Sequence, residues 1–154
     1  MVYAVVRVRG TVNVKPNIRK TLELLRLTRT NHCVLLEEND VHKGMLQIIK
    51  DYTTWGEINK EALLKLLSAR GKLSGDKPLT EEYLKKATPY HSYEKLSEAL
   101  LENKVQYKEI PEIKPFFRLH PPKKGHRTVK RSFVNKGSLG YRKEAINTLI
   151  ERML

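Results

Sequence analysis

The sequence predicts an α+β fold: a small β-α-β-α-β core sheet with helices on one face, then a helical extension, a long basic loop and a C-terminal helix. Two observations support this prediction. Apolar residues change from strand spacing to helical spacing and back through the first 58 residues. A chain of 154 residues, 40% of them hydrophobic, can also bury the core of one domain with an appended subdomain. We therefore divide the chain into residues 1–58, 59–113, 114–138 and 139–154.

The first strand and helix are predicted by periodicity. Residues 2–9 alternate, so that small apolar side chains at even positions would face the core and Arg7 and Arg9 a wetter, basic side. A helix is expected over residues 16–27, because Pro16 is tolerated in a first turn and leucines follow at helical spacing.

The second half of the core repeats the alternation. Residues 32–36 form a short apolar run that favours a buried strand. Asn39 or Asp40 would cap a second helix, and residues 53–58 would form a third strand. A strand, a helix and another strand usually form a right-handed crossover. We therefore expect both helices on one face of the sheet and the other face open.

Residues 59–113 are nearly neutral and predicted to be helical. A leucine-rich helix over residues 59–70 would stop at Gly71, and shorter helices would cover residues 80–87 and 92–102. This segment is expected to be an extension of the core.

The C-terminal part is predicted to be a tethered basic loop. Three prolines, with basic, aromatic and small residues between them, predict an extended loop with little regular structure over residues 114–138. Residues 139–154 would form a helix, with Leu139, Ile146 and Leu149 on its apolar side, and so anchor the loop to the body.

Positive charge is concentrated in two stretches. The formal net charge of the chain is +13; residues 114–143 carry ten Lys or Arg and no acid, and residues 1–36 carry seven basic side chains and one acid. An ordinary solvated surface mixes both signs, whereas a stretch of one sign repels itself until something negative neutralises it. The distribution therefore predicts a polyanionic partner, and structured RNA before DNA, since no helix is evident for a major groove.

Basic side chains neutralise phosphates, and aromatic or imidazole rings between them can stack on unpaired bases. Phe116 and Phe117 follow a proline, and we expect them to pin the loop to the body instead. The candidate RNA-binding residues are Arg7, Arg9, Lys15, Arg19, Lys20, Arg26, Arg29, Lys114, Arg118, His120, Lys123, Lys124, His126, Arg127, Lys130, Arg131, Lys136, Tyr141, Arg142 and Lys143.

No set of residues has the spacing of a catalytic or metal site. Cys33 lies in an apolar run, as a buried thiol would, and His32 would face the other way on the same strand. The single cysteine also fits a reducing compartment and excludes a disulfide framework or a multi-cysteine zinc site. We expect no enzymatic activity, no metal and no cofactor.

Two other classes of protein fit the charge distribution less well. An RNA-processing enzyme or an accessory nucleic-acid-binding subunit would need clustered acids, histidines or a metal. A peripheral membrane protein would need a basic amphipathic helix, but prolines interrupt the basic stretch, and no apolar run approaches the roughly 20 residues of a bilayer span.

A pattern of residues in the first half of the sequence resembles that of a known protein family. The pattern that carries the resemblance is Thr21-Leu22, Leu25, Leu27, Arg29, His32 and Val34, followed by Met45-Leu46, Ile49 and Tyr52-Thr53. It resembles the signature of the L-thirty family of large-subunit ribosomal proteins, whose eukaryotic counterpart is L-seven. The stretch LHPPKKGHRTVKRSF and the terminal GSLGYRKEAINTLIERML are similar to the basic loop and last helix of the longer archaeal and eukaryotic members.

The resemblance implies a ferredoxin-like core and a structural, non-catalytic role in translation. It implies binding to 23S rRNA near the 5S rRNA, next to other large-subunit proteins, in cytoplasmic ribosomes. It implies neither a membrane nor a small-molecule substrate as partner.

Overall fold

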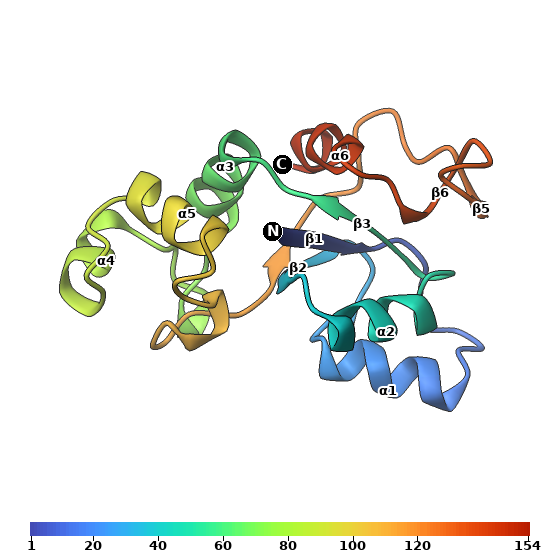
Figure 1. The fold of residues 1–154 in the computed structure, drawn as a ribbon, viewed down its shortest axis with the longest axis horizontal. Coiled ribbons are helices and arrows are strands. Elements are labelled where there is room, and N and C mark those ends of the chain that lie inside the picture. The colour runs from blue at the N-terminus through green and yellow to red at the C-terminus, as the bar shows by residue number, and fades with distance from the viewer.

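Six strands form one mixed sheet in the order β4-β2-β1-β3-β6-β5, and helices cover both of its faces (Figure 1). The structure is a computed structural model that describes all 154 residues. The strands are β1 (Val2–Arg7), β2 (His32–Glu37), β3 (Thr53–Glu57), β4 (Phe117–Arg118), β5 (Thr128–Ser132) and β6 (Gly137–Tyr141). The α-helices are α1 (Pro16–Leu24), α2 (Asp40–Ile48), α3 (Lys60–Arg70), α4 (Glu81–Ala87), α5 (Tyr93–Leu101) and α6 (Ala145–Met153). The 3-10 turns are η1 (Ser74–Asp76) and η2 (Tyr107–Glu109).

The predicted β-α-β-α-β order of the first 58 residues is confirmed. Asn39 caps α2, with its side chain accepting a hydrogen bond of 2.7 Å from the backbone N–H of His42. Helix α1 begins at Pro16 as predicted but ends at Leu24, because Arg26 adopts a φ of 59° and turns the chain so that Leu27 returns to the core.

The connection between the first two strands differs from the expectation. Strand β1 is antiparallel to both β2 and β3, so β1 and β2 do not form the parallel pair of a crossover unit. Strands β2 and β3 are therefore parallel to each other, and the crossover is the β2-α2-β3 unit that passes over β1. The sheet still has α1 and α2 on one face, below it in Figure 1.

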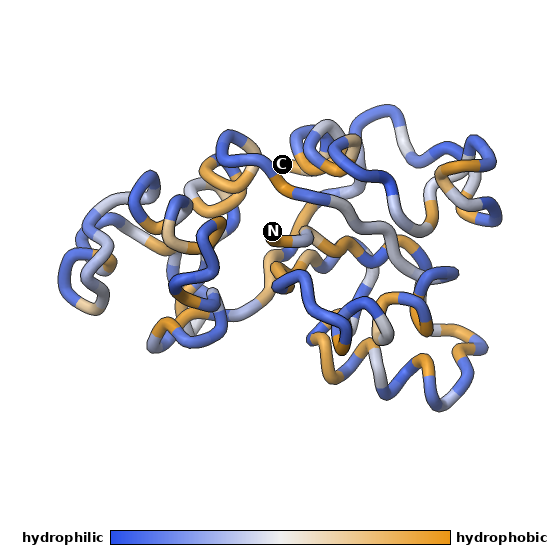
Figure 2. Tube along the Cα trace, viewed as in Figure 1, coloured by the Kyte–Doolittle hydropathy of each residue, from blue (hydrophilic) through white to orange (hydrophobic).

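The opposite face of the sheet is covered, so the expectation of an open face is wrong. Tyr3 and Val5 of β1 pack with α1 and α2 in one apolar cluster, while Ala4 and Val6 pack in a second cluster with α3, α5 and α6. All of β1 is consequently buried. Figure 2 shows apolar segments gathered along the inner sides of the helices and the central strands.

The helical extension shares this second cluster. Asn59 caps α3 by accepting from the N–H of Ala62 at 2.8 Å, and Thr80 and Ser92 cap α4 and α5. Phe117 is fully buried, and its ring stacks on that of Tyr107 with centroids 4.9 Å apart. The extension is thus fixed to the sheet by common apolar packing.

The basic segment contains more regular structure than its composition predicts. Strand β4 pairs with β2, and β6 pairs with β3, so residues 114–138 are not simply an extended loop. The last helix begins at Ala145, not at residue 139, because residues 137–141 are a strand; Gly140 there has a φ of +78°. The chain entering α6 passes so close to β3 that a side chain at Gly56 would collide with the backbone carbonyl of Lys143.

No helix in the structure combines the length and the apolar character needed to cross a bilayer.

Candidate nucleic-acid interface

The structure separates the predicted basic residues into buried, paired and exposed groups. These groups differ in what they can offer an RNA phosphate, because a side chain already fixed inside the protein cannot reach one without unfolding its surroundings.

Arg7 belongs to the buried group, with 3% of its surface exposed. Its guanidinium donates to the carbonyl of Leu27 at 2.6 Å, to that of Gly10 at 3.0 Å and to that of Arg9 at 2.9 Å. Burial lowers the pKa of Arg7 from its usual value. Arg7 therefore holds the loops at the end of β1 and is not part of the exposed surface.

Arg142 is the second buried cation, 8% exposed. Its Nε donates to Thr54 Oγ1 and its Nη2 to the carbonyl of Ser138, each at 2.7 Å, and it lies over the ring of Phe133. Burial, and then repulsion from Arg152 and Arg127, lowers the pKa of Arg142 to about 10. This side chain joins β6 to β3 from inside.

Three further candidates are paired within the protein. Lys114 and Arg118 both contact the carboxylate of Asp76, the latter at 3.3 Å. The hydroxyl of Tyr141 donates to Glu57, and burial together with that carboxylate raises the pKa of Tyr141. The sequence offered no sign of these partners, since Asp76 lies 38 residues before Lys114.

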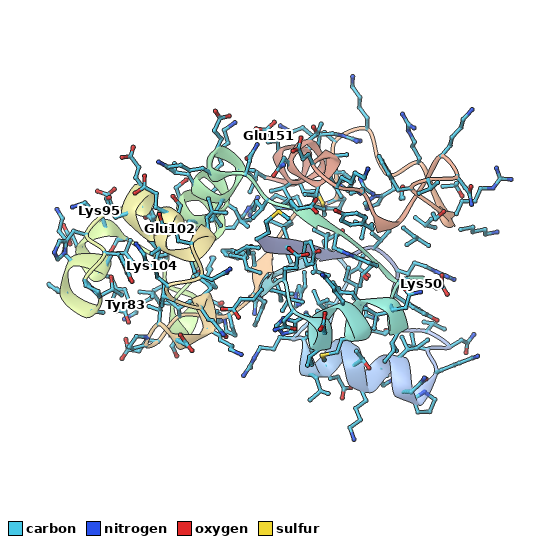
Figure 3. The ribbon with its side chains drawn as sticks, viewed as in Figure 1. Lys50, Tyr83, Lys95, Glu102, Lys104 and Glu151 are labelled. Atoms are coloured by element: carbon cyan, nitrogen blue, oxygen red, sulfur yellow. The ribbon has the colours of Figure 1, made fainter.

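The largest exposed group surrounds the last two strands. None of its members forms an ion pair with a carboxylate, and each is exposed. We call it the β5–β6 surface; it comprises Lys123, Lys124, Arg127, Lys130, Arg131, Lys136 and Lys143. Figure 3 shows nitrogen-tipped side chains projecting from this end of the molecule, whereas around Lys95, Glu102 and Lys104 oxygen and nitrogen tips are mixed.

A second exposed group follows the first helix. We call it the α1 surface; it comprises Arg9, Lys15, Arg19, Lys20, Arg26 and Arg29, all exposed. A cavity of about 220 Å³ opens beside it, between Arg7, Arg19 and Glu23. The α1 and β5–β6 surfaces both lie in the part of the molecule away from α4 (Figure 1).

The two histidines of the basic segment are placed differently. His120 is exposed, and its backbone N–H donates to the carbonyl of Met153 at 3.0 Å. His126 is half-buried, and its Nε2 atom is buried without a hydrogen-bond partner. Burial, and then repulsion from Arg142 and Arg152, lowers the pKa of His126.

Sequence reasoning missed Arg152 as a part of this interface. Its guanidinium donates to the carbonyl oxygens of Lys123 and Gly125 at 2.6–2.9 Å, which fixes the chain that leads into β5. Nothing in the local sequence marks this role, because it depends on α6 packing beside a segment 27 or more residues earlier.

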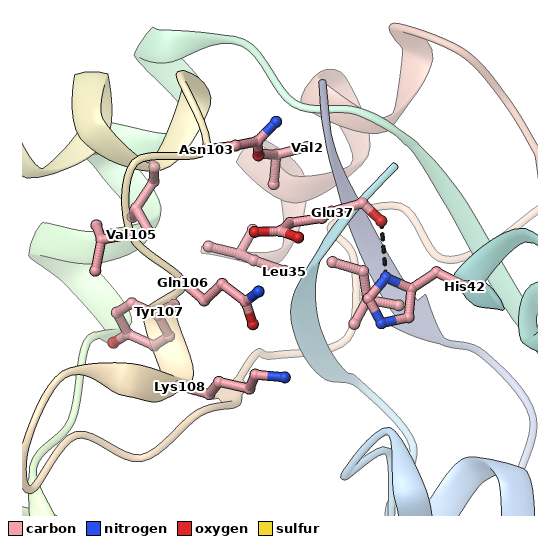
Figure 4. A pocket seen from close by; sticks show the side chains of 11 residues that line it. Val2, Leu35, Glu37, His42, Asn103, Val105, Gln106, Tyr107 and Lys108 are labelled. Atoms are coloured by element: carbon pink, nitrogen blue, oxygen red, sulfur yellow. Dashed lines mark hydrogen bonds between the residues drawn. The ribbon is translucent and has the colours of Figure 1, made fainter. Parts of the chain in front are cut away.

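Another cavity, of about 50 Å³, lies between β2 and the chain after α5 (Figure 4). His42 lines this cavity, and its Nδ1 atom lies 2.8 Å from the carbonyl oxygen of Glu37. Its walls combine apolar side chains with Glu37 and Lys108, so it lacks the uniform positive charge of the two basic surfaces.

Cys33 and His32 have structural surroundings. The Cys33 thiol is fully buried, which raises its pKa to about 12, and His32 stacks on Phe116 with ring centroids 4.9 Å apart. No group of three or more His, Cys, Asp and Glu side chains in the 154 residues is arranged to hold a metal ion.

Fold and surface together define a class: a small α+β protein that presents cations without carboxylate partners on an exposed strand, on the turns near it and along a helix. Comparison with known proteins narrows this class. The family model described as ribosomal protein L30p/L7e matches residues 3–53. "Large ribosomal subunit protein uL30" of Methanocorpusculum labreanum is 46% identical over 151 residues, covering 98% of this chain and 99% of that protein. The proteins of the same name from Archaeoglobus fulgidus and Methanosphaera stadtmanae are 46% and 47% identical, with 98% and 99% of this chain covered and 99% of each relative. The chain belongs to the ribosomal protein L30p/L7e family, as its signature residues predicted.

Proposed function

We propose that this protein is a structural, non-enzymatic constituent of the large ribosomal subunit, and that it binds 23S rRNA near the 5S rRNA. The observation that carries the proposal is the β5–β6 surface, where seven exposed basic side chains have no carboxylate partner. The relatives named as large-subunit proteins support the same role.

The mechanism is electrostatic. Lys and Arg side chains on both basic surfaces would contact phosphates and release condensed counterions, which supplies the free energy of binding. RNA strands that would repel each other could then approach on either side of the protein.

The shape of the basic segment supports this mechanism. The pairing of β4 with β2 fixes one end of the segment, and the pairing of β6 with β3 fixes the other. Its middle is held by a backbone hydrogen bond of 2.9 Å from the N–H of Lys123 to the carbonyl of Arg152. A segment held in this way presents its cations in fixed positions, so less conformational entropy is lost on binding than for a free tail.

The test is binding of the full-length protein to purified 23S rRNA over a range of salt concentrations. With six to ten phosphates contacted, the affinity should fall by about 10³–10⁵ between 50 and 200 mM salt. The protein should also sediment with 50S particles in a sucrose gradient. Affinity that does not change with salt, or absence from the particles, would contradict the proposal.

The alternative of an RNA-processing enzyme has less support, because two acids near the basic segment already bind its side chains. Asp76 binds Lys114 and Arg118, and Glu57 binds Tyr141. A metal-dependent cleavage assay with the same rRNA would test it.

A further inference from the structure

We propose that a cavity between β6, α6 and the chain before β5 is a specific site for one phosphodiester group of the RNA backbone. We call it the His126 pocket; it is lined by His126, Arg127, Arg142, Thr148 and Arg152, among others, and has a volume of about 280 Å³. This inference rests on the proposed function and adds a defined ligand group and site to it.

Basic side chains line the pocket, and no acidic side chain does. Three arginines and a histidine border it, together with the hydroxyls of Ser138 and Thr148. The α1 cavity, in contrast, includes Glu23, and the cavity beside β2 includes Glu37. An anion in the His126 pocket would therefore meet attraction from several sides and no carboxylate repulsion.

Several donors in the pocket are already in place but unused. The buried Nε2 of His126 has no partner in the protein. Arg142 uses Nε and Nη2 on Thr54 and Ser138, and Arg152 uses Nε and Nη2 on the carbonyls of Lys123 and Gly125. The Nη1 of each arginine is left without an acceptor, and the bonds made by the other nitrogens fix the guanidinium planes.

The charge of the pocket is out of balance until an anion enters. A buried cation is ordinarily paired with an acid, because taking it out of water is costly. Arg142 has only neutral oxygens and a ring as partners, and Arg152 and Arg127 lie near enough to lower its pKa. One phosphate oxygen pair could accept from guanidinium groups, with the short, charge-assisted geometry that arginine favours.

The occupant argued for is a phosphodiester of RNA and not a free phosphate. The pocket lies within the β5–β6 surface: Arg127 belongs to both, and Lys123 and Lys124 lie three and two residues before His126 in the sequence. If a backbone phosphate is held here, the phosphates on either side of it in the RNA chain would contact the exposed cations. A free phosphate ion has no such neighbours and would gain nothing from those cations.

Binding should also take up a proton. The groups facing His126 are Arg142 on the β6 side, Arg152 on α6 and Arg127 beside it, and together they disfavour the imidazolium. The negative charge of a phosphodiester in the pocket favours the imidazolium. The pKa of His126 is therefore higher in the bound form than in the free form, and affinity should rise as pH falls from the bound-form pKa to the free-form pKa.

The first experiment follows the histidine side chains by ¹H–¹⁵N NMR while dimethyl phosphate is titrated into the full-length protein. His126 signals should shift and saturate, with an affinity on the order of millimolar for so small a probe, and the pKa of His126 should rise. His120, exposed and outside the pocket, is the internal control. Equal, non-saturating shifts of both histidines would overturn the proposal, as would a short oligoribonucleotide that leaves the His126 signals unshifted.

The second experiment compares Arg127→Gln with Arg131→Gln. Both residues are exposed and lie within the β5–β6 surface, and each change removes one charge, but only Arg127 lines the pocket. We expect Arg127→Gln to weaken dimethyl phosphate binding about tenfold and Arg131→Gln to leave it within about twofold. Equal unfolding midpoints of both variants would show that folding is not the cause, and equal losses of binding would refute the site.

The outcomes separate this inference from the proposed function. If the protein binds 23S rRNA with a steep salt dependence but dimethyl phosphate leaves His126 unchanged, the pocket is wrong and the ribosomal role stands. If dimethyl phosphate saturates His126 but 23S rRNA does not bind, the ribosomal role fails, and the RNA phosphodiester fails with it.

Discussion

Neutralising three cations of the β5–β6 surface should change RNA binding without changing the fold. Lys130, Arg131 and Lys136 are exposed, and none of them has a carboxylate partner. Replacing all three by Gln removes three positive charges while keeping long polar side chains. The free energy of unfolding should therefore stay nearly the same.

The size of the effect follows from counterion release. Each phosphate contact contributes about 0.7–0.9 to the slope of log affinity against log salt. Three lost contacts should make the slope shallower by about 2–3. Between 50 and 200 mM salt, the triple variant should then lose roughly 20- to 40-fold less affinity than the natural protein does.

The assay is filter binding or fluorescence anisotropy with 23S rRNA at several salt concentrations. The matched control is Lys85→Gln, Lys86→Gln and Lys95→Gln, which removes the same charge from exposed positions on α4 and α5. The control slope should stay close to that of the natural protein. Equal slopes for the two triple variants would show that net charge alone governs binding, and the assignment of the β5–β6 surface would be refuted.

Three further predictions concern stability. Phe117→Ala should lower the free energy of unfolding by about 3–5 kcal/mol in urea, because it empties a fully buried site, and a loss below 1 kcal/mol would mean that β4 does not pin the basic segment. Arg142→Ala should lower the free energy of unfolding by about 1–3 kcal/mol, because it leaves buried acceptors unpaired. Arg142→Met should lower it less, since methionine fills the volume without a buried charge, and the reverse order would contradict this account. Burial, and then Arg118, lower the pKa of His32 below its usual 6.5, so the unfolded chain binds more protons than the folded one and the free energy of unfolding should fall as pH drops below about 6.5. His32→Phe should flatten that decline in urea titrations at several pH values. An unchanged slope of the free energy of unfolding against pH would exclude His32 as its source.

Local sequence signals predicted the elements whose causes are local. Asn39 and Asn59 cap helices where polar residues precede apolar repeats, and Pro16 begins α1. The three core strands also follow the predicted ranges closely, because their apolar runs are short and bounded by polar breaks. Periodicity and capping were sufficient for these parts of the fold.

The remainder depended on contacts between distant residues. Strand β4 has two residues, and it exists because Phe117 fits beside Cys33 of β2. Strand β6 pairs with β3 across more than 80 residues of chain, where Thr54 Oγ1 donates to the carbonyl of Gly140 at 2.8 Å. A basic, proline-containing sequence gives no local sign of such pairing, so composition alone predicted a loop.

The sequence predicted which stretches of the chain carry the excess positive charge, but not which of their side chains are exposed. Charge counting located both basic surfaces, but it treated every arginine as equivalent. Arg7 and Arg142 differ from Arg127 only through tertiary packing, which places the first two inside and the third outside. The sequence also concealed Asp76 as the partner of Arg118.

The two buried arginines suggest why the basic surfaces can stay uniformly positive. Arg7 and Arg142 hold loops next to the α1 and β5–β6 surfaces, and both do so through carbonyl and hydroxyl oxygens. A carboxylate partner would stabilise a buried guanidinium more strongly, but it would add a negative charge beside the positions proposed for RNA phosphates. Neutral acceptors bind all three guanidinium nitrogens of Arg7 and two of Arg142, and they leave the positive field intact. The Lys60–Glu98 and Lys104–Glu102 ion pairs lie on the helical extension, where such a field is not required. Introducing an acid beside Arg142, as in Ser138→Asp, should therefore weaken RNA binding even if the fold tolerates it, whereas a gain in RNA affinity would contradict this account.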